Sequence, residues 1–248
     1  MKLNQGHHES KLIGFTIDYY SAKWGGYTLD HLNEMIGIAK PLLEPIFDLV
    51  PNQGGYILDI GTGPGTIPFA FVKMRHSKDY IRIMGIDPSQ PAINFANQMA
   101  IEFKVENFVK FRLGTFEDIP FPDNTFDVVI SNASFNLSTQ KEEAVQEMYR
   151  VVKDEGIVII ADCFRKKVSK VSNQCNTRLW AICVSGAIEI NWLISYAKSI
   201  KLRHIGSMDL THVVTALILE GKWNWKEFID FDLEYSALKF IKTKGERT

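Results

Sequence analysis

Residues 56–66 of the chain read YILDIGTGPGT, and the fold follows from this stretch. It begins as a short apolar strand, 56–60, and leads into a helix predicted through 69–74. The three glycines between them let the backbone turn sharply and approach a ligand more closely than any Cβ would permit. The N-terminus of the following helix presents free N–H groups, which favour an anionic ligand group. The spacing is G-x-G-x-G and not the G-x-G-x-x-G of dinucleotide sites, which disfavours a nucleotide-linked oxidoreductase.

Apolar strands alternate with helical segments from this point onward. The pattern predicts strands at 56–60, 81–86, 108–113, 126–130 and 157–161, with helices at 91–103 and 141–152 between some of them. Strands separated by helices at this spacing form right-handed βαβ units and a parallel sheet, covered on both faces. Two later strands, 202–210 and 233–243, are predicted to close the sheet with an antiparallel edge. The fold class is therefore α/β, with a mostly parallel seven-stranded sheet and helices on both faces.

A second motif, GIDPS at 85–89, ends the second predicted strand. Asp87 follows Gly65 by 87 − 65 = 22 residues. An α/β cofactor fold places at about this distance the carboxylate that accepts hydrogen bonds from ribose hydroxyls. Such a carboxylate would repel a 2′-phosphate, so an NADP-like ligand fits poorly. The alternative is that Asp-Pro-Ser caps the next helix.

An acidic residue followed by G-x-G-x-G resembles the first motif of the class I methyltransferases that use S-adenosylmethionine (SAM). The resemblance implies a Rossmann-like methyltransferase fold in which the glycine loop holds the amino-acid end of SAM. It also implies that Asp59 contacts the SAM ammonium and that Asp87 binds its ribose. The cofactor-binding residues expected from these two motifs are Asp59, Gly61, Thr62, Gly63, Gly65, Asp87 and Pro88.

Residues 114–127, GTFEDIPFPDNTFD, are similar to the G-D-A-E-x-L-P-F-x-D-x-S-F-D stretch of ubiquinone/menaquinone-biosynthesis-type methyltransferases. The first acid of that stretch commonly contacts the adenine amino group, but here Thr115 takes its place and offers only a hydroxyl. The backbone at Phe116 and the side chain of Glu117 are therefore expected to complete the adenine site. Residues 147–156 resemble the family's E-x-x-R-V-L-K-P-G-G segment, a helix end followed by a turn at Gly156.

The resemblance extends from about residue 56 to residue 162, and the segments outside it are expected to cover the pocket. Residues 1–50 are predicted to form an N-terminal helical cap, with a break near Pro41 and Pro45. Residues 51–248 would form the SAM-binding methyltransferase domain, with a substrate-covering insertion at about 163–200. Within that insertion a buried or half-buried helix is predicted over 179–199. No element is assigned to 211–230.

Composition restricts the partners. The 28 Lys and Arg residues nearly balance the 29 Asp and Glu residues, giving a formal net charge of −1, so binding to nucleic acid through a basic surface is disfavoured. The N-P-P-Tyr motif of enzymes that methylate base amino groups is also missing after Ile130. The segment 179–199 is interrupted by polar residues, which disfavours a membrane span. Three cysteines are too few for a disulfide framework, so free thiols and a cytoplasmic protein are expected. A homodimer is left open.

The fourth predicted strand ends near Asn132, at the sheet edge where the methyl group and its acceptor should meet. Asn132 is therefore counted with the cofactor site. No catalytic residue is assigned, and the candidates are Tyr20, His212 and Cys183. Aromatic residues in the flanking segments favour a small, partly apolar methyl acceptor, and no metal site is predicted.

The resulting interpretation is a SAM-dependent methyltransferase that acts on a small molecule by in-line methyl transfer and releases S-adenosyl-L-homocysteine. One alternative is a non-catalytic SAM-binding protein with a regulatory or assembly role. A second is a thiol or metalloid methyltransferase, because 183–187, CVSGA, resembles a C-x-x-G-A segment of arsenite-methyltransferase-like proteins. In that case Cys163 and Cys175 would supply further soft ligands.

Overall fold

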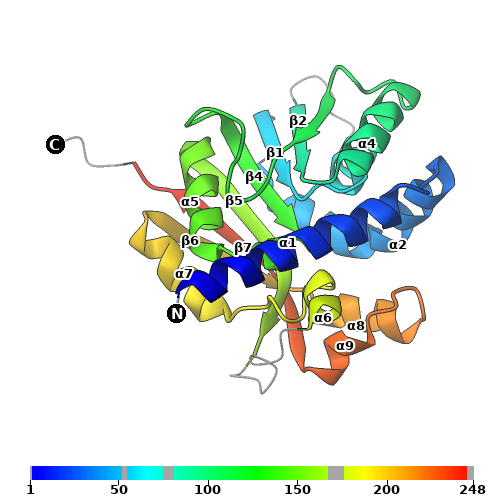
Figure 1. Ribbon diagram of the computed structural model, residues 1–248. Coiled ribbons are helices and arrows are strands. Elements are labelled where there is room, and N and C mark those ends of the chain that lie inside the picture. Colours follow the sequence, from blue (N-terminus) through cyan, green and yellow to red (C-terminus); the bar gives the residue numbers. More distant parts are fainter. Residues whose placement is uncertain (1, 52–54, 75–80, 167–175, 245–248) are drawn as a thin grey trace.

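The computed structural model describes residues 2–51, 55–74, 81–166 and 176–244, with side chains from residue 11 onward. Within these residues, seven strands form one sheet in the order β3-β2-β1-β4-β5-β7-β6 (Figure 1). The strands are β1 (Gly55–Ile60), β2 (Ile81–Asp87), β3 (Val109–Leu113), β4 (Phe126–Asn132), β5 (Val152–Arg165), β6 (Leu202–Asp209) and β7 (Leu233–Lys242). The first five pair in parallel, whereas β7 runs antiparallel to both of its neighbours, β5 and β6. The predicted fold class is confirmed.

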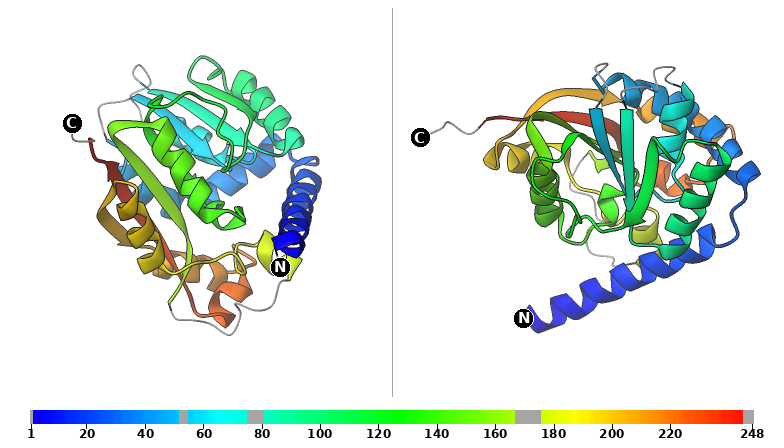
Figure 2. Two further views of the ribbon diagram at one scale, coloured as in Figure 1. Left: turned by 60° about the vertical axis from the view of Figure 1, so that its left-hand side comes forward. Right: turned by 90° about the horizontal axis from the view of Figure 1, so that it is seen from above.

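Helices cover both faces of this sheet. They are α1 (Lys2–Trp24), α2 (Leu29–Asp48), α3 (Thr66–Met74), α4 (Gln90–Glu102), η1 (Phe135–Leu137), α5 (Lys141–Val151), α6 (Thr177–Ala181), α7 (Ile190–Ser199), α8 (Thr211–Leu219) and α9 (Lys226–Asp230). Two buried apolar clusters lie on the two faces, one joining the sheet to α2, α3, α4 and α8 and the other joining it to α5 and α7. Figures 1 and 2 show α1 as a long helix that crosses outside these layers, and it packs against α4 and α6.

The prolines of α2 do not interrupt it, so the predicted break near Pro41 and Pro45 is wrong. Proline has a backbone φ compatible with a helix and mainly removes one N–H donor, so a helix can continue if other contacts stabilise it. In α2 those contacts come from a buried apolar stripe that runs past both prolines: Leu32, Ile36, Ala39, Leu42, Leu43, Ile46 and Phe47. The chain instead turns before α2, where Thr28 caps the helix by accepting a hydrogen bond from the His31 N–H.

The single helix predicted over 179–199 is also wrong, because the chain forms α6 and α7 with an irregular segment between them. Cys183 adopts a left-handed conformation with φ of 66°, which ends the first helix. Gly186 then passes so close to η1 that an added Cβ would lie 1.9 Å from the carbonyl oxygen of Asn136. This contact with a distant segment cannot be recognised in a local hydrophobic pattern. The unassigned stretch 211–230 forms α8 and α9.

The turn predicted at Gly156 is a bulge inside β5. The pairing with β4 jumps from Phe126↔Val152 to Val128↔Ile157. Glu155, with φ of 64°, is the residue in the left-handed region. Gly156 is needed because of space, since a Cβ there would lie 2.8 Å from the carbonyl oxygen of Lys153.

Among the described residues, no helix combines the length and the hydropathy that a membrane-spanning helix requires.

Candidate cofactor and acceptor site

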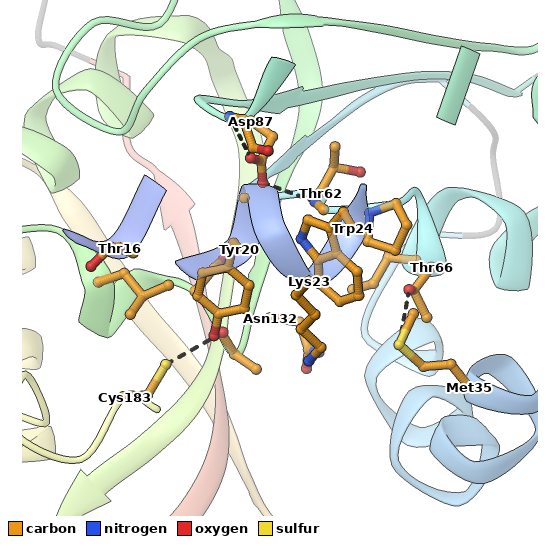
Figure 3. A pocket seen from close by; sticks show the side chains of 18 of the residues that line it. Thr16, Tyr20, Lys23, Trp24, Met35, Thr62, Thr66, Asp87, Asn132 and Cys183 are labelled. Atoms are coloured by element: carbon orange, nitrogen blue, oxygen red, sulfur yellow. Dashed lines mark hydrogen bonds between the residues drawn. The ribbon is translucent and has the colours of Figure 1, made fainter. Parts of the chain in front are cut away.

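A cavity of about 650 Å³ lies at the carboxyl ends of β1, β2 and β4, beneath α1 and beside α2 (Figure 3). Ligands of parallel α/β sheets bind at this edge. Most of the residues singled out in the sequence line it: Tyr20, Asp59, Gly61, Thr62, Gly63, Asp87, Pro88, Thr115, Phe116, Glu117, Asn132 and Cys183. Two do not. Gly65 lies behind the turn, and His212 is exposed on the first turn of α8.

The glycine turn is held by hydrogen bonds to the neighbouring strand. The N–H groups of Gly61 and Thr62 both donate to the carbonyl oxygen of Ile86, at 2.9 and 3.0 Å. Gly61 has φ of 72°, and a Cβ there would lie 2.4 Å from the Cβ of Ser134, so a side chain cannot be accommodated. Gly65, with φ of 87°, is required because Phe69 and Phe111 occupy the space that its Cβ would fill.

Asp59 ends β1 with a carboxylate that the described residues leave incompletely paired. Its side chain is 2% exposed, and neither Asp59 Oδ2 nor the nearby Thr62 Oγ1 has a hydrogen-bond partner there. Burial raises the pKa of Asp59 to about 7, while the Thr62 hydroxyl opposes this shift from close by without reaching hydrogen-bond geometry. A buried anion without a counter-charge is unfavourable, so a cationic ligand group at this position would be stabilising.

Asp87 joins the glycine turn to the start of α4. Its Oδ2 accepts a hydrogen bond from the Gly63 N–H and its Oδ1 accepts one from the Ser89 N–H, both at 2.9 Å. The capping alternative applies to Ser89, whose hydroxyl accepts a hydrogen bond from the Ala92 N–H and caps α4. Burial raises the pKa of Asp87, with the two backbone N–H groups opposing the shift. The carboxylate is thus held rigidly at the cavity wall.

The segment after β3 forms the part of the wall next to Asp87, to whose carbonyl oxygen the Gly114 N–H donates at 3.3 Å. Thr115 Oγ1 accepts a hydrogen bond from the Asp118 N–H at 3.1 Å, and Glu117 accepts one from the Ser138 hydroxyl at 2.6 Å. Phe116 packs edge-on against Phe135, with ring centroids 6.0 Å apart. The wall therefore combines an aromatic surface with one carboxylate, a composition suited to a flat heteroaromatic ring.

Helix α1 covers the cavity and is fastened at two points. The Tyr20 hydroxyl donates to the carbonyl oxygen of Ala181 at 2.7 Å, and the hydroxyls of Ser21 and Ser89 are 2.9 Å apart. At the end of α1, the indole of Trp24 lies 3.5 Å from where a Cβ on Gly63 would be. Figure 3 shows Trp24 among the side chains that line the pocket. Burial, with the neighbouring Cys183, raises the pKa of Tyr20 well above its usual value, so this phenol is protonated at neutral pH and is a poor general base.

The cysteines near the cavity are also protonated at neutral pH. Burial raises the pKa of both Cys163 and Cys183 well above the usual value for a thiol. Cys183 lines the cavity, whereas Cys163 lies beneath it and donates to the carbonyl oxygen of Cys183 at 3.3 Å. Cys175 lies outside the described residues. In the part of the chain that is described, no three His, Cys, Asp or Glu side chains are grouped as a metal site would require.

The carboxyl ends of β4 and β5 carry a polar network that the sequence did not reveal. The Asp162 carboxylate accepts hydrogen bonds from the N–H groups of Asn136 and Cys163. Lys141 donates to the carbonyl oxygens of Asn136 and Ser138 from below η1. Burial raises the pKa of Asp162 to about 6 and lowers that of Lys141 to about 8. These residues fix η1, and each looks unremarkable in sequence because its partners are distant.

Tyr235 was also missed. It is fully buried in β7, and its hydroxyl donates to Asn132 Oδ1 at 2.9 Å. The sequence signal was a hydroxyl-bearing aromatic residue within a strand that also carries polar and charged residues. Its importance depends on the strand order, which places β7 directly beside β5.

A sheet of this order, with an acid and a glycine turn after β1 and a second acid after β2, defines the Rossmann-like fold of the class I SAM methyltransferases. The comparison with protein families agrees. A family model described as a methyltransferase domain matches residues 51–230, and the chain belongs to this family.

Individual relatives share only part of their length with the chain. It is 34% identical over 107 residues to the uncharacterized methyltransferase YcgJ of Bacillus subtilis, a match covering 43% of this chain and 40% of that protein. It is 27% identical over 146 residues to an arsenite methyltransferase of Aquipseudomonas alcaligenes, covering 56% of this chain and 41% of the relative. It is 24% identical over 143 residues to the ubiquinone/menaquinone biosynthesis C-methyltransferase of Rickettsia akari, covering 56% of this chain and 58% of the relative. The resemblances drawn from the sequence are thereby confirmed.

Among solved structures, geranyl diphosphate C-methyltransferase from Streptomyces coelicolor superposes with a TM-score of 0.68 and 17% identity. The match covers 82% of this chain and 79% of that one. That structure contains S-adenosyl-L-homocysteine together with Mg²⁺ and geranyl diphosphate. At this level of identity the likeness shows a shared fold.

Proposed function

We propose that the protein is a SAM-dependent methyltransferase that methylates a small, partly apolar molecule by in-line displacement and releases S-adenosyl-L-homocysteine. The observation that carries this proposal is the cavity itself. It brings the incompletely paired, buried carboxylate of Asp59, the glycine turn and Asp87 together at one sheet edge. In SAM, the ammonium would pair with Asp59, and the chain that carries the sulfonium would pass close to the glycine turn. The ribose hydroxyls would donate to Asp87.

The wall residues fit the remaining parts of this cofactor. The Phe116 ring and the Glu117 carboxylate would bind the adenine, with Thr115 adding a hydroxyl in place of the family's acid. The N–H groups of Gly61, Thr62 and Gly63 already bond within the protein, so they are not free for the cofactor carboxylate. Lys23, which lines the cavity from α1, would supply a positive charge for it instead.

The bound cofactor would supply a methyl group made electrophilic by the positive sulfonium. The task of the protein is then to align the acceptor and to exclude water, which lowers the barrier by restricting the reactants to a productive geometry. Trp24 and Tyr20 exclude water from above. The apolar side of the cavity, formed by Met35, Ile38 and Leu42 of α2, would hold the acceptor. No general base is assigned, since one is needed only if the acceptor must lose a proton.

The two alternatives make different predictions. A non-catalytic SAM-binding protein would bind the cofactor and its product without forming S-adenosyl-L-homocysteine from SAM with any acceptor. A metalloid methyltransferase would need thiolate ligands, but burial raises the pKa of both described cysteines. The protonated state of these two thiols therefore favours an organic acceptor.

The proposal is tested by calorimetric titration with SAM, S-adenosyl-L-homocysteine and NAD. We expect both sulfur ligands to bind and NAD not to bind. Asp87→Ala should weaken their binding by about tenfold or more, because a hydrogen-bonded charged partner of the ribose is lost. The matched control is Asp230→Ala, which removes an exposed carboxylate of α9 whose nearest basic partner, Lys226, is 4.0 Å away. Failure of SAM to bind, or equal affinity in Asp87→Ala, would contradict the assignment.

A further inference from the structure

The contact between Tyr235 and Asn132 determines which atoms face the acceptor. Burial raises the pKa of Tyr235 well above its usual value, so its hydroxyl is protonated and acts as a donor. Two oxygens lie within reach, Asn132 Oδ1 at 2.9 Å and the carbonyl oxygen of Ala161 at 3.2 Å. The Ala161 oxygen already accepts a hydrogen bond from the Ala133 N–H at 2.8 Å. The shorter contact and the free acceptor both place the Tyr235 hydrogen on Asn132 Oδ1.

The orientation of the Asn132 amide follows from this hydrogen bond. With Oδ1 engaged by Tyr235, Nδ2 is left on the other side of the side chain. No residue in the described part of the chain accepts a hydrogen bond from Nδ2, and Asn132 is half-buried in the cavity wall. An amide NH₂ can only donate. This part of the wall therefore offers a hydrogen-bond donor to whatever occupies the cavity.

Asn132 lies at the end of the strand that pairs with β1, beside the glycine turn. Asn132 is the last residue of β4. Two residues later, the Ser134 hydroxyl donates to the carbonyl oxygen of Ile60 at 2.8 Å, against the glycine turn. In Figure 3, Asn132 lies on the side of the pocket where Cys183 is found, and Asp87 lies at the opposite end. Asn132 is thus near the glycine turn in the sheet and away from Asp87.

The cavity that Asn132 lines also has apolar walls. Trp225, which lines the cavity, packs edge-on against the Tyr235 ring with centroids 6.4 Å apart. Met35, Ile38 and Leu42 of α2 line the same cavity. Between apolar walls, a hydrogen bond discriminates between ligands more strongly than in water. If a ligand has no acceptor for the amide, the amide loses its hydration and gains no hydrogen bond in return.

We propose that the methyl acceptor is an apolar molecule with a hydrogen-bond-accepting oxygen, of the carbonyl, phenolate or enolate class, that binds to Asn132 Nδ2. Tyr235 is the positioning residue that keeps this amide turned toward the acceptor. The inference rests on the proposed function. In the transfer, an electron pair of the acceptor forms the new bond to the methyl carbon, while the carbon–sulfur bond breaks and its electrons return to sulfur. A neutral phenol or enol loses its proton to bulk water before it enters the cavity, so that the bound acceptor is the phenolate or enolate.

The test uses a matched pair of probes, methoxynaphthalene and ethylnaphthalene substituted at the same position. They differ only in an oxygen atom where the other has a methylene group. Each is titrated into the full-length protein saturated with S-adenosyl-L-homocysteine. We expect the oxygen-containing probe to bind about fivefold or more tightly, which is the size of one hydrogen bond in an apolar site.

Tyr235→Phe should bring the affinities of the two probes to within about twofold of each other, because the amide is no longer held in one orientation. Affinity for S-adenosyl-L-homocysteine should not change. The control is Tyr196→Phe, which removes a hydroxyl bonded to Gln146 on the exposed side of α7. Thermal unfolding of both variants verifies that they fold.

The outcomes separate the two proposals. Absence of S-adenosyl-L-homocysteine binding would overturn the proposed function. Normal binding of that ligand, together with equal or absent binding of the two probes, would overturn the donor inference alone. A preference for oxygen that survives in Tyr235→Phe would overturn the role of Tyr235.

Discussion

At the scale of single residues, Asp59 combines deep burial with an ionisable group that the described residues do not fully pair. Its folded-state pKa of about 7 lies above the unfolded value of about 3.9. The folded protein therefore binds this proton more tightly than the unfolded chain. The contribution of Asp59 to the free energy of unfolding decreases as pH rises from about 4 to about 7. A cationic ligand reverses the preference, because it favours the ionised carboxylate.

The raised pKa of Asp59 predicts how ligand affinity depends on pH. Affinity for S-adenosyl-L-homocysteine should be about fivefold lower at about pH 6 than at about pH 7, because the ionised fraction of Asp59 falls from about one half to about one tenth. Calorimetric titration at both pH values measures the ratio. Asp59→Asn should bind more weakly at both pH values and lose the dependence. Asp162 also titrates in this range. If the pH dependence of binding persists in Asp59→Asn, it arises from another group such as Asp162.

At the scale of elements, α1 is a cover whose attachment to the rest of the protein is partly polar. Tyr20 bonds to the carbonyl oxygen of Ala181 and Ser21 bonds to Ser89, so α1 joins the segment after β5 to the segment after β2. Both contacts lie at the rim of the cavity. They stabilise the closed position more than they stabilise the sheet, which is held by its own strand pairing.

The double variant Tyr20→Phe with Ser21→Ala should loosen this cover without unfolding the domain. Each hydrogen bond contributes about 1 kcal/mol, so hydrogen exchange of the α1 amides should be about tenfold faster or more. Exchange in β1 and β4 should be unchanged. Ser199→Ala, which removes a local bond to the Tyr196 carbonyl oxygen on α7, is the control. Equal exchange rates in α1 of the double variant and the parent would show that these contacts do not hold the helix.

At the scale of the whole molecule, the end of β7 is tied to the α5 side of the sheet by one buried cation. Lys242 is 5% exposed, and its ammonium donates to the carbonyl oxygens of Tyr149 and Val152 and to Asn124 Oδ1, at 2.8–2.9 Å. The three acceptors belong to the end of α5, the start of β5 and the turn before β4. The ammonium thus joins the antiparallel strand to the parallel part of the sheet.

Lys242→Met should lower the free energy of unfolding by about 2 kcal/mol or more, because it leaves buried acceptors unpaired. Urea denaturation followed by circular dichroism measures the change. Lys110→Met, on the exposed face of the edge strand β3, should change stability by less than about 0.5 kcal/mol. Comparable losses in the two variants would show that the Lys242 contacts contribute little.

The sequence by itself determined the order of strands and helices from residue 56 to residue 162, and most of the residues that line the cavity around the glycine turn. Local patterns suffice there, because a strand, a glycine turn and a following acid are close in sequence and in space. Asp59, Gly61 and Asp87 could be identified for this reason. The turn-forming role of Gly65 was also recognisable, although its place behind the cavity was not.

Only the tertiary structure decided how the flanking segments meet that wall. The continuity of α2 through its prolines depends on a buried stripe, and the separation of α6 from α7 depends on a contact with η1. The Tyr235–Asn132 pair, 103 residues apart, depends on β7 pairing beside β5. These features arise from packing between elements, whose energies depend on which surfaces become neighbours. A linear pattern specifies each surface but not its neighbour, and so the glycine-turn end of the cavity was predictable, while the side formed by the flanking segments was not.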